Sequence, residues 1–232
     1  MSTYRIITPL CPSVNYGFQK SPSFSLQTPF SHAILVENVR ERTERGDRMP
    51  SAHNPAARFG LSDSDLARLW EIMEEAFPPE ERRTRKGFAR ILRDPALCLT
   101  VHRDAAGLPA AFLIGWELEG FRYVEHFAVS AALRGQGMGG RMLADFLSAA
   151  PAPVVLEVEP PETDTARRRV AFYERLGFCL NPYPYEQPPL QPTTSAIPLM
   201  VMSWPAPLSE EDFGRVREEL YRRVYRVGQQ VL

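Results

Sequence analysis

The chain has 232 residues, of which 24% are charged, and its formal net charge is −1. This length suits one substantial domain with an appendage, and the balanced charge argues against a general binder of nucleic acid or anionic membranes. We expect no membrane span, because no apolar stretch approaches the roughly 20 residues required, and no signal peptide. The three cysteines, Cys11, Cys98 and Cys179, lack metal-ligand spacing. They predict reduced thiols in a cytoplasmic protein and no metal site.

Residues 1–55 differ in composition from the rest of the chain, being rich in Ser, Pro, Thr and Asn. This composition predicts a mostly disordered extension, with one short helix near residues 32–45. Residues 56–232 are then expected to form the globular domain. Met49 lies just before it, and one hypothesis is that translation begins there.

The first half of the domain has the pattern of two helices followed by three strands. Ser62 or Asp63 is a suitable N-cap for a helix whose apolar residues lie on one face, and Pro78 ends this pattern. Turn-forming residues between the first two predicted strands indicate an antiparallel hairpin. The predicted ranges are 63–77 and 83–92 for the helices, and 97–102, 110–118 and 123–129 for the strands.

Four glycines then fall within residues 135–140, directly before an amphipathic helix that begins at Arg141. The later elements are expected as strand, helix, strand, loop, strand and helix, over residues 154–158, 164–176, 178–180, 181–192, 197–203 and 208–228. Gly177 is placed to end the first of these helices, and Ser209 to cap the second. The predicted fold class is α/β, with a mixed sheet of antiparallel hairpins and one parallel crossover through the helix after the glycines.

A strand that leads into a glycine-rich turn at the start of a helix can bind phosphate, because the helix N–H groups and the helix dipole face the anion. Gly135, Gly137 and Gly140 satisfy the dinucleotide pattern G-x-G-x-x-G, with Glu157 and Glu159 about 20 residues later. However, the strand ends several residues before the first glycine, and hairpins rather than βαβ units precede it. We therefore disfavour dinucleotide binding, and a Walker-type loop fails because no Gly-Lys-Ser/Thr follows.

The pattern that fits is Arg134-x-x-Gly137-x-Gly139, after a strand that ends in Phe-Ala-Val and before a helix. With it, the sequence resembles the GNAT superfamily of N-acetyltransferases over residues 60–204. The resemblance also includes the segments EHFAV, LEVE and FYERLGF, which are residues 125–129, 156–159 and 172–178. It implies a mixed, mostly antiparallel sheet with a parallel crossover and splayed central strands, flanked by helices.

The resemblance further implies acetyl-CoA as the co-substrate, with the acetyl group held between strands 125–129 and 156–159. Backbone N–H groups of residues 136–140 would bind the pyrophosphate, and Arg134 would position the loop or contact phosphate. Unpaired backbone groups of Phe127 and Val129 would bond the pantetheine arm as an added strand would. The residues implied to bind the co-substrate are Phe127, Ala128, Val129, Arg134, Gly135, Gln136, Gly137, Met138, Gly139 and Gly140.

Acetyl transfer to an amine requires a base for the ammonium proton and a proton donor near the departing sulfur. Tyr173 matches the tyrosine that members of this superfamily often place beside that sulfur, so it is the general-acid candidate. Glu125 is the favoured base, acting through water, because strand alternation places it in phase with Phe127 and Val129. The same alternation directs His126 to the opposite face, which makes it the second choice.

Glu157 and Glu159 share one face of their predicted strand and are candidates for proton relay or substrate binding. Glutamates gather near strand ends that frame the predicted cleft, namely Glu117, Glu119, Glu125, Glu157, Glu159 and Glu162. This cluster favours a cationic acceptor, and residues 181–192 could form an aromatic wall over it. The predicted function is therefore acetyl transfer from acetyl-CoA to a primary amine of a small cationic acceptor.

Polyamines, aminoglycosides, amino acids and peptide amines all remain open as acceptors. Two other classes of protein also remain open, a non-catalytic acyl-CoA-binding or interaction module and a protein or peptide N-acetyltransferase. We expect no nucleic-acid or membrane partner, and the sequence leaves open whether the protein forms a homodimer.

Overall fold

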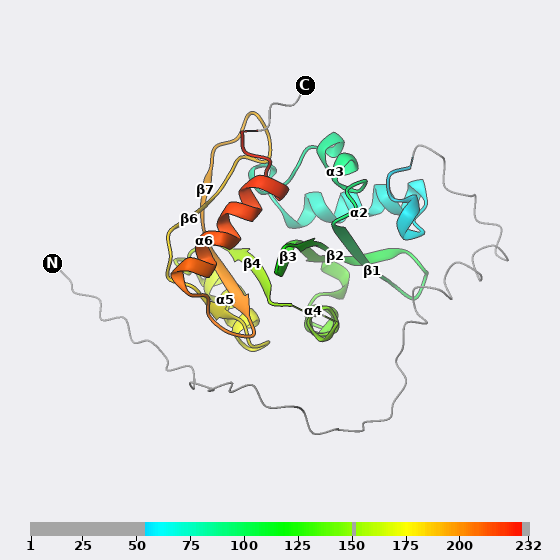
Figure 1. The fold of residues 1–232 in the computed structure, drawn as a ribbon. Coiled ribbons are helices and arrows are strands. Elements are labelled where there is room, and N and C mark those ends of the chain that lie inside the picture. The colour runs from blue at the N-terminus through cyan, green and yellow to red at the C-terminus, as the bar shows by residue number, and fades with distance from the viewer. Residues whose placement is uncertain (1–53, 150–151, 229–232) are drawn as a thin grey trace, which may run out of the picture.

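A seven-stranded mixed sheet lies at the centre of the computed structural model, which describes residues 54–149 and 152–228 (Figure 1). The strands are β1 (Leu97–Arg103), β2 (Pro109–Leu118), β3 (Phe121–Val129), β4 (Val154–Val158), β5 (Cys179–Leu180), β6 (Tyr185–Gln187) and β7 (Ile197–Trp204). Their order is β1-β2-β3-β4-β7-β5, and β6 pairs with β7. β3 and β4 are parallel, whereas the other described pairs are antiparallel. The predicted fold class is confirmed.

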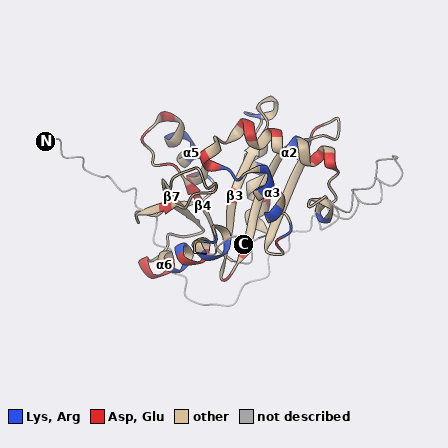
Figure 2. Cartoon of the chain, turned by 90° about the horizontal axis from the view of Figure 1, so that it is seen from above, with Lys and Arg blue, Asp and Glu red and all other residues tan. Residues whose placement is uncertain are grey.

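Helices cover both faces of this sheet. They are α2 (Asp63–Ala76), α3 (Arg85–Ile91), α4 (Met138–Ser148), α5 (Asp164–Glu174) and α6 (Glu210–Glu219), with short turns η1 (Ala57–Phe59), η2 (Pro79–Glu81), η3 (Ala131–Leu133) and the π turn η4 (Leu220–Val224). α2, α3 and α6 bury apolar residues on one face, and α4 and α5 on the other. Charged residues lie mainly on the helices and connections rather than on the strands (Figure 2). No helix in the described part of the chain has the length and apolar character of a membrane span.

Short-range signals fix the helix ends. Ser62 is the N-cap of α2, where its hydroxyl and backbone N–H form a reciprocal capping box with Asp65. Gly177 has a φ of +89°, and the N–H groups of Gly177 and Phe178 donate to the carbonyls of Glu174 and Tyr173. These two bonds form a Schellman motif at the end of α5. Both predicted helix ends are confirmed.

Three predicted elements differ from the structure. The helix predicted to begin at Arg141 begins at Met138, so Gly139 and Gly140 belong to its first turn. Residues 181–192 are not all loop, because Tyr185 and Gln187 point inward from β6, which pairs with β7. One α-helix was predicted over residues 208–228, but α6 spans only Glu210–Glu219. It begins after the Ser209 N-cap, and the π turn η4 follows it.

Several predictions concern residues 1–53, which lie outside the described part of the chain. They are the extension, the short helix near residues 32–45, the state of Cys11 and the start of translation at Met49. The domain boundary at residue 56 therefore stays a prediction.

Candidate active site

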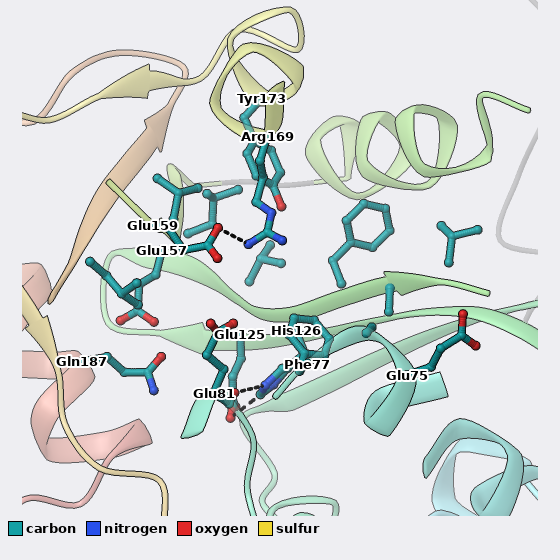
Figure 3. A pocket seen from close by; sticks show the side chains of 18 of the residues that line it. Glu75, Phe77, Glu81, Glu125, His126, Glu157, Glu159, Arg169, Tyr173 and Gln187 are labelled. Atoms are coloured by element: carbon teal, nitrogen blue, oxygen red, sulfur yellow. Dashed lines mark hydrogen bonds and ion pairs between the residues drawn. The ribbon is translucent and has the colours of Figure 1, made fainter. Parts of the chain in front are cut away.

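β3 and β4 separate along their length. Parallel pairing joins only Arg122–Val124 of β3 to Val154–Leu156 of β4, and beyond these residues the two strands diverge. A cavity of about 370 Å³ lies in the gap, and residues of β3, β4, α5 and β6 and segments near η2 line it (Figure 3). The predicted splaying of the central strands is confirmed.

The separation follows a bulge in β3. In the register with β2, His126 lies opposite Ile114 and Val124 lies opposite Gly115, so Glu125 is the extra residue. An extra residue bends the bulged strand and increases its local twist. The bulge therefore accounts for the point at which β3 leaves β4.

The bulge also changes which side chains share a face. Phe127 and Val129 pack on the α4 side of the sheet, whereas Glu125 bonds the Trp116 side chain on the opposite side. His126 lies on the same side as Glu125, with its Nδ1 atom 3.6 Å from Glu125 Oε1, and both residues line the cavity. Two predictions are therefore wrong. Glu125 is not in phase with Phe127 and Val129, and His126 does not point away from Glu125.

The glycine-rich loop leaves a helix end open to an anion. Gly135 and Gly137 have φ values of +78° and +73°, and α4 begins at Met138 with no side-chain cap from the described residues. The first N–H groups of a helix lack intrahelical partners, and they lie at the positive end of its dipole. A Cβ atom added at Gly135 or Gly140 would meet no described atom within 4 Å. This geometry fits a bound pyrophosphate.

Gly139 has a different role in the loop. A Cβ atom at this position would lie 3.2 Å from the Phe127 ring and 3.7 Å from the Val129 side chain. Glycine therefore lets the first turn of α4 approach β3 closely.

Backbone groups of β3 face the gap. The Ser130 N–H donates to the Ala110 carbonyl of the neighbouring chain segment. Because hydrogen bonding alternates along an antiparallel pair, the N–H and C=O groups of Phe127 and Val129 point away from β2. The N–H and C=O groups of Phe127 therefore face the β3–β4 gap.

Arg134 already occupies part of this edge. Its Nε donates to the Val129 carbonyl at 2.9 Å, and its guanidinium lies 3.2 Å from Glu75 of α2. Arg134 therefore ties the loop to the end of β3 and to α2. The backbone groups of Val129 were predicted to be unpaired, and for the carbonyl this is wrong, because Arg134 bonds it.

Tyr173 lines the cavity from α5, and its ring packs against Phe172 and Phe178. Burial raises the pKa of its hydroxyl to about 12. Tyr173 therefore stays protonated at neutral pH and can donate a proton. Arg169, one turn earlier on α5, pairs with Glu159 at 2.5 Å.

Glu125 is a buried carboxylate with a dedicated cation. One oxygen lies 2.8 Å from Arg83 Nε and the other accepts from Trp116 Nε1 at 2.5 Å. Burial acts to raise the pKa of Glu125, but the Arg83 charge and the hydrogen bonds outweigh it, and the pKa lies below its usual value. Glu125 is therefore ionised at neutral pH and is a weak base.

Glu157 is a second buried carboxylate, and tyrosines surround it. It accepts hydrogen bonds from the hydroxyls of Tyr123 at 2.8 Å, Tyr225 at 2.6 Å and Tyr185. Burial raises the pKa of Glu157, and these bonds offset only part of the rise. Glu159 turns instead towards Arg169, so the two carboxylates diverge although they were predicted to share a face.

The structure brings Glu125, Glu157, Glu159 and Tyr173 to one cavity, but it does not bring Glu117 there. Glu117 lies at the far end of β2, where its carboxylate is 2.7 Å from Arg122. The assignment of Glu117 to the acceptor site is therefore wrong. Sequence reasoning missed several residues around the site, namely Glu75, Glu81, Arg83, Tyr123, Arg169, Gln187 and Tyr225.

Gln187 is the missed residue with a signal in the sequence, since it follows Tyr185 at the strand spacing of two. The others approach from distant segments and carry no local pattern. Among the described residues, no cluster of three or more His, Cys, Asp or Glu side chains has the geometry of a metal site.

An uncapped glycine loop that opens onto the gap between two splayed strands is the architecture of acyltransferases that bind an acyl-CoA. The sequence profile of the "Acetyltransferase (GNAT) family" matches residues 66–178. The chain is 34% identical to a solved structure described as "Putative acetyltransferase from GNAT family from Bacteroides thetaiotaomicron", with a TM-score of 0.64 over 72% of this chain and 97% of that one. The chain belongs to the GNAT acetyltransferase family, which uses acetyl-CoA as co-substrate.

A curated relative is "Putative acetyltransferase YjbC" of Bacillus subtilis (strain 168), which is 33% identical over 112 residues. This match covers 47% of the present chain and 55% of the relative. The chain therefore matches just over half the length of that protein.

Proposed function

We propose that this protein transfers the acetyl group of acetyl-CoA to a primary amine of a small cationic acceptor. The observation that carries the proposal is the cavity in the β3–β4 gap, which Phe127, Ala128, Val129 and Arg134 line next to the glycine loop and which Glu125, Glu157 and Glu159 also line (Figure 3). The co-substrate would lie along Phe127, Ala128 and Val129, with its pyrophosphate at residues 135–140. Arg134 would hold this loop in place.

The charge of the cavity supports a cationic acceptor. Its lining includes five glutamates and two arginines, namely Glu75, Glu81, Glu125, Glu157, Glu159, Arg134 and Arg169. Arginines pair with Glu75, Glu125 and Glu159. Within the described residues, this leaves Glu81 and Glu157 without an ion-pair partner, and burial raises the pKa of both. A bound ammonium would supply the missing positive charge.

In the proposed reaction the amine nitrogen attacks the acetyl carbonyl carbon, so that an N–C bond forms and the C–S bond breaks. Tyr173 donates a proton to the departing sulfur, and a carboxylate takes the proton that the amine loses. Glu125 was the predicted base, but its bonds to Arg83 and Trp116 stabilise the charged form and hold its pKa below the usual value. We favour Glu157, directly or through water, because its raised pKa lies closer to neutral pH.

The proposed function is tested with acetyl-CoA and a panel of amines: spermidine, kanamycin, an alanine-terminated peptide and a lysine-containing peptide. Release of CoA thiol, measured above background hydrolysis, should depend on at least one of these amines. Tight acetyl-CoA binding without amine-dependent thiol release would contradict catalysis and favour a non-catalytic CoA-binding module. Turnover of the peptides alone would contradict a small-molecule acceptor.

Tyr173→Phe is expected to lower kcat by about 100-fold, because it removes the proposed proton donor to sulfur. The hydroxyl pKa of about 12 keeps Tyr173 protonated across the assay range, so the loss should be equal at pH 7 and pH 9. Tyr183→Phe is the control, since the Tyr183 hydroxyl bonds the Leu208 carbonyl away from the cavity. A wild-type rate in Tyr173→Phe would reject this role.

A further inference from the structure

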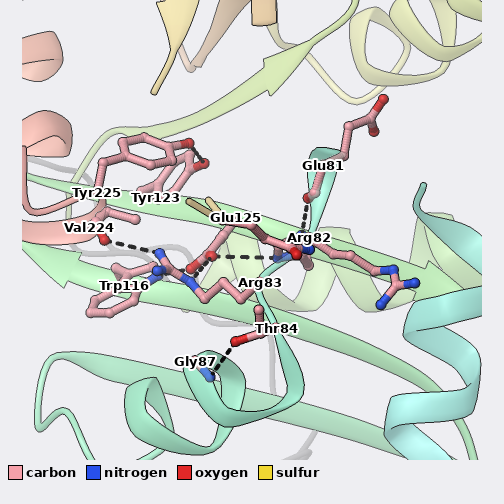
Figure 4. Close-up of polar contacts among 12 residues, drawn as sticks. Glu81, Arg82, Arg83, Thr84, Gly87, Trp116, Tyr123, Glu125, Val224 and Tyr225 are labelled. Atoms are coloured by element: carbon pink, nitrogen blue, oxygen red, sulfur yellow. Dashed lines mark hydrogen bonds and ion pairs between the residues drawn. The ribbon is translucent and has the colours of Figure 1, made fainter. Parts of the chain in front are cut away.

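The C-terminal segment bonds one buried carboxylate of the cavity, Glu157, directly and is linked to the other, Glu125, through Arg83. We call residues 220–225, which comprise η4 and Tyr225, the C-terminal turn. It lies outside the region that the family profile matches, residues 66–178. In Figure 4, the Val224 carbonyl points towards Arg83, and the Tyr225 hydroxyl lies next to that of Tyr123 on β3.

One contact reaches Glu125 through an arginine. Arg83 donates from one nitrogen to the Val224 carbonyl at 3.0 Å and from Nε to Glu125 at 2.8 Å. The side chains of Arg83 and Glu125 are only 9% and 1% exposed. The backbone of the C-terminal turn therefore orients the cation that compensates Glu125.

The second contact reaches Glu157 directly. The Tyr225 hydroxyl donates to Glu157 at 2.6 Å, and its oxygen lies 3.0 Å from the Tyr123 hydroxyl, which also donates to Glu157. Tyr185 supplies the third hydroxyl from β6. A carboxylate that accepts several hydrogen bonds is stabilised in its charged form. These hydroxyls therefore oppose the effect of burial on Glu157.

Packing holds the C-terminal turn in this position. Leu220 and Val224 are fully buried, and the Tyr225 N–H donates back to the Leu220 carbonyl at 3.0 Å, which makes the wide turn. Arg226, which follows, pairs with Asp94 at 3.0 Å. Turns of this width are rare and often occur at functional sites, because they redirect side chains that a regular helix would send elsewhere.

We propose that Tyr225 is a positioning residue of the acceptor site, which sets the orientation and proton affinity of Glu157 from outside residues 66–178, the region that the family profile matches. The inference rests on the proposed function, in which Glu157 receives the amine proton. Other titratable groups also act on Glu157, namely Tyr123 and Glu125 from β3 and Tyr185 from β6. Tyr221 of the C-terminal turn does not bond Glu157; burial, with a smaller contribution from the Glu157 charge, raises the pKa of the Tyr221 hydroxyl. Arg83 acts indirectly, because it compensates Glu125.

Tyr225→Phe removes one donor to the charged form of Glu157 and keeps the ring, so the pKa of Glu157 should rise by about one pH unit. Carboxyl ¹³C NMR of the full-length protein without ligand measures this pKa, and the Glu157→Gln spectrum assigns the resonance.

Tyr221→Phe is the matched control. It removes a hydroxyl from the same turn, but that hydroxyl donates to the Glu186 carbonyl rather than to Glu157. We expect the pKa of Glu157 to stay near its wild-type value in this variant. An unchanged pKa in folded Tyr225→Phe, or an equal shift in both variants, would overturn the inference.

The pH dependence of kcat/KM, with whichever amine of the panel is acetylated, gives the second measurement. Because the base acts when ionised, a higher pKa moves the acidic limb of the profile up by about one pH unit and leaves the alkaline plateau unchanged. A uniform loss at all pH values would indicate a merely structural role and contradict the proposal. An NMR shift without turnover of any amine would instead contradict the proposed function alone.

Discussion

Replacing Gly137 by glutamate is expected to weaken acetyl-CoA binding by at least about 100-fold, which corresponds to about 2.7 kcal/mol. Gly137 is the N-cap of α4 and has a φ of +73°, which a residue with a side chain adopts only with strain. The new carboxylate would also stand at the positive end of the helix and repel the pyrophosphate. Isothermal titration calorimetry with acetyl-CoA measures the change.

Gly107→Glu is the control for this variant. Gly107 has a φ of +78° in the turn between β1 and β2, and a Cβ atom there meets no described atom within 4 Å. The control therefore carries a similar backbone strain and the same added charge, away from the loop. We expect a similar fall in Tm and wild-type affinity for acetyl-CoA. Wild-type affinity in Gly137→Glu would refute the assignment of the loop.

Features that depend on neighbouring residues could be predicted from the sequence. The β-branched run Val154–Val158 has the bounds of β4, and Ser62 caps α2 as its spacing from the apolar residues indicates. The glycines likewise follow β3 at the start of α4, with Gly135 and Gly137 before the helix and Gly139 and Gly140 in its first turn. Each of these features follows from local backbone preference and hydrophobic periodicity, which require no knowledge of distant contacts.

Features that depend on distant residues could not be predicted. The bulge at Glu125 is a property of the register between β2 and β3, and strict alternation placed Glu125 on the wrong face. The tyrosines that bond Glu157 lie 34, 28 and 68 residues away in the sequence. Arg83 lies 42 residues from Glu125. Such partners are defined only when the sheet and the C-terminal segment have packed together.

Arg83→Met is expected to cost about 3–5 kcal/mol of the free energy of unfolding, because it leaves the Glu125 carboxylate buried without its cation. The Glu125 side chain is 1% exposed, so water cannot replace the lost partner. For a domain of this size, such a loss lowers Tm by about 10 °C. Thermal unfolding followed by circular dichroism measures the effect. Arg215→Met is the surface control, since Arg215 pairs with exposed carboxylates, and it should change Tm little.

Removing the unpaired Glu125 charge tests whether that charge causes the loss of stability in Arg83→Met. Adding Glu125→Gln to Arg83→Met should recover part of the lost stability, whereas independent effects would add.

The pH dependence of the stability of Arg83→Met gives the same test without a second substitution. In the wild type the pKa of Glu125 is lowered, so its stabilising contribution is present above its unfolded-state pKa and is lost as the pH falls through the folded value. In Arg83→Met burial dominates and raises that pKa, so the variant should gain stability relative to the wild type as the pH falls. A deficit that stays constant between pH 7 and pH 4 would show that lost packing, rather than the unpaired carboxylate, causes it.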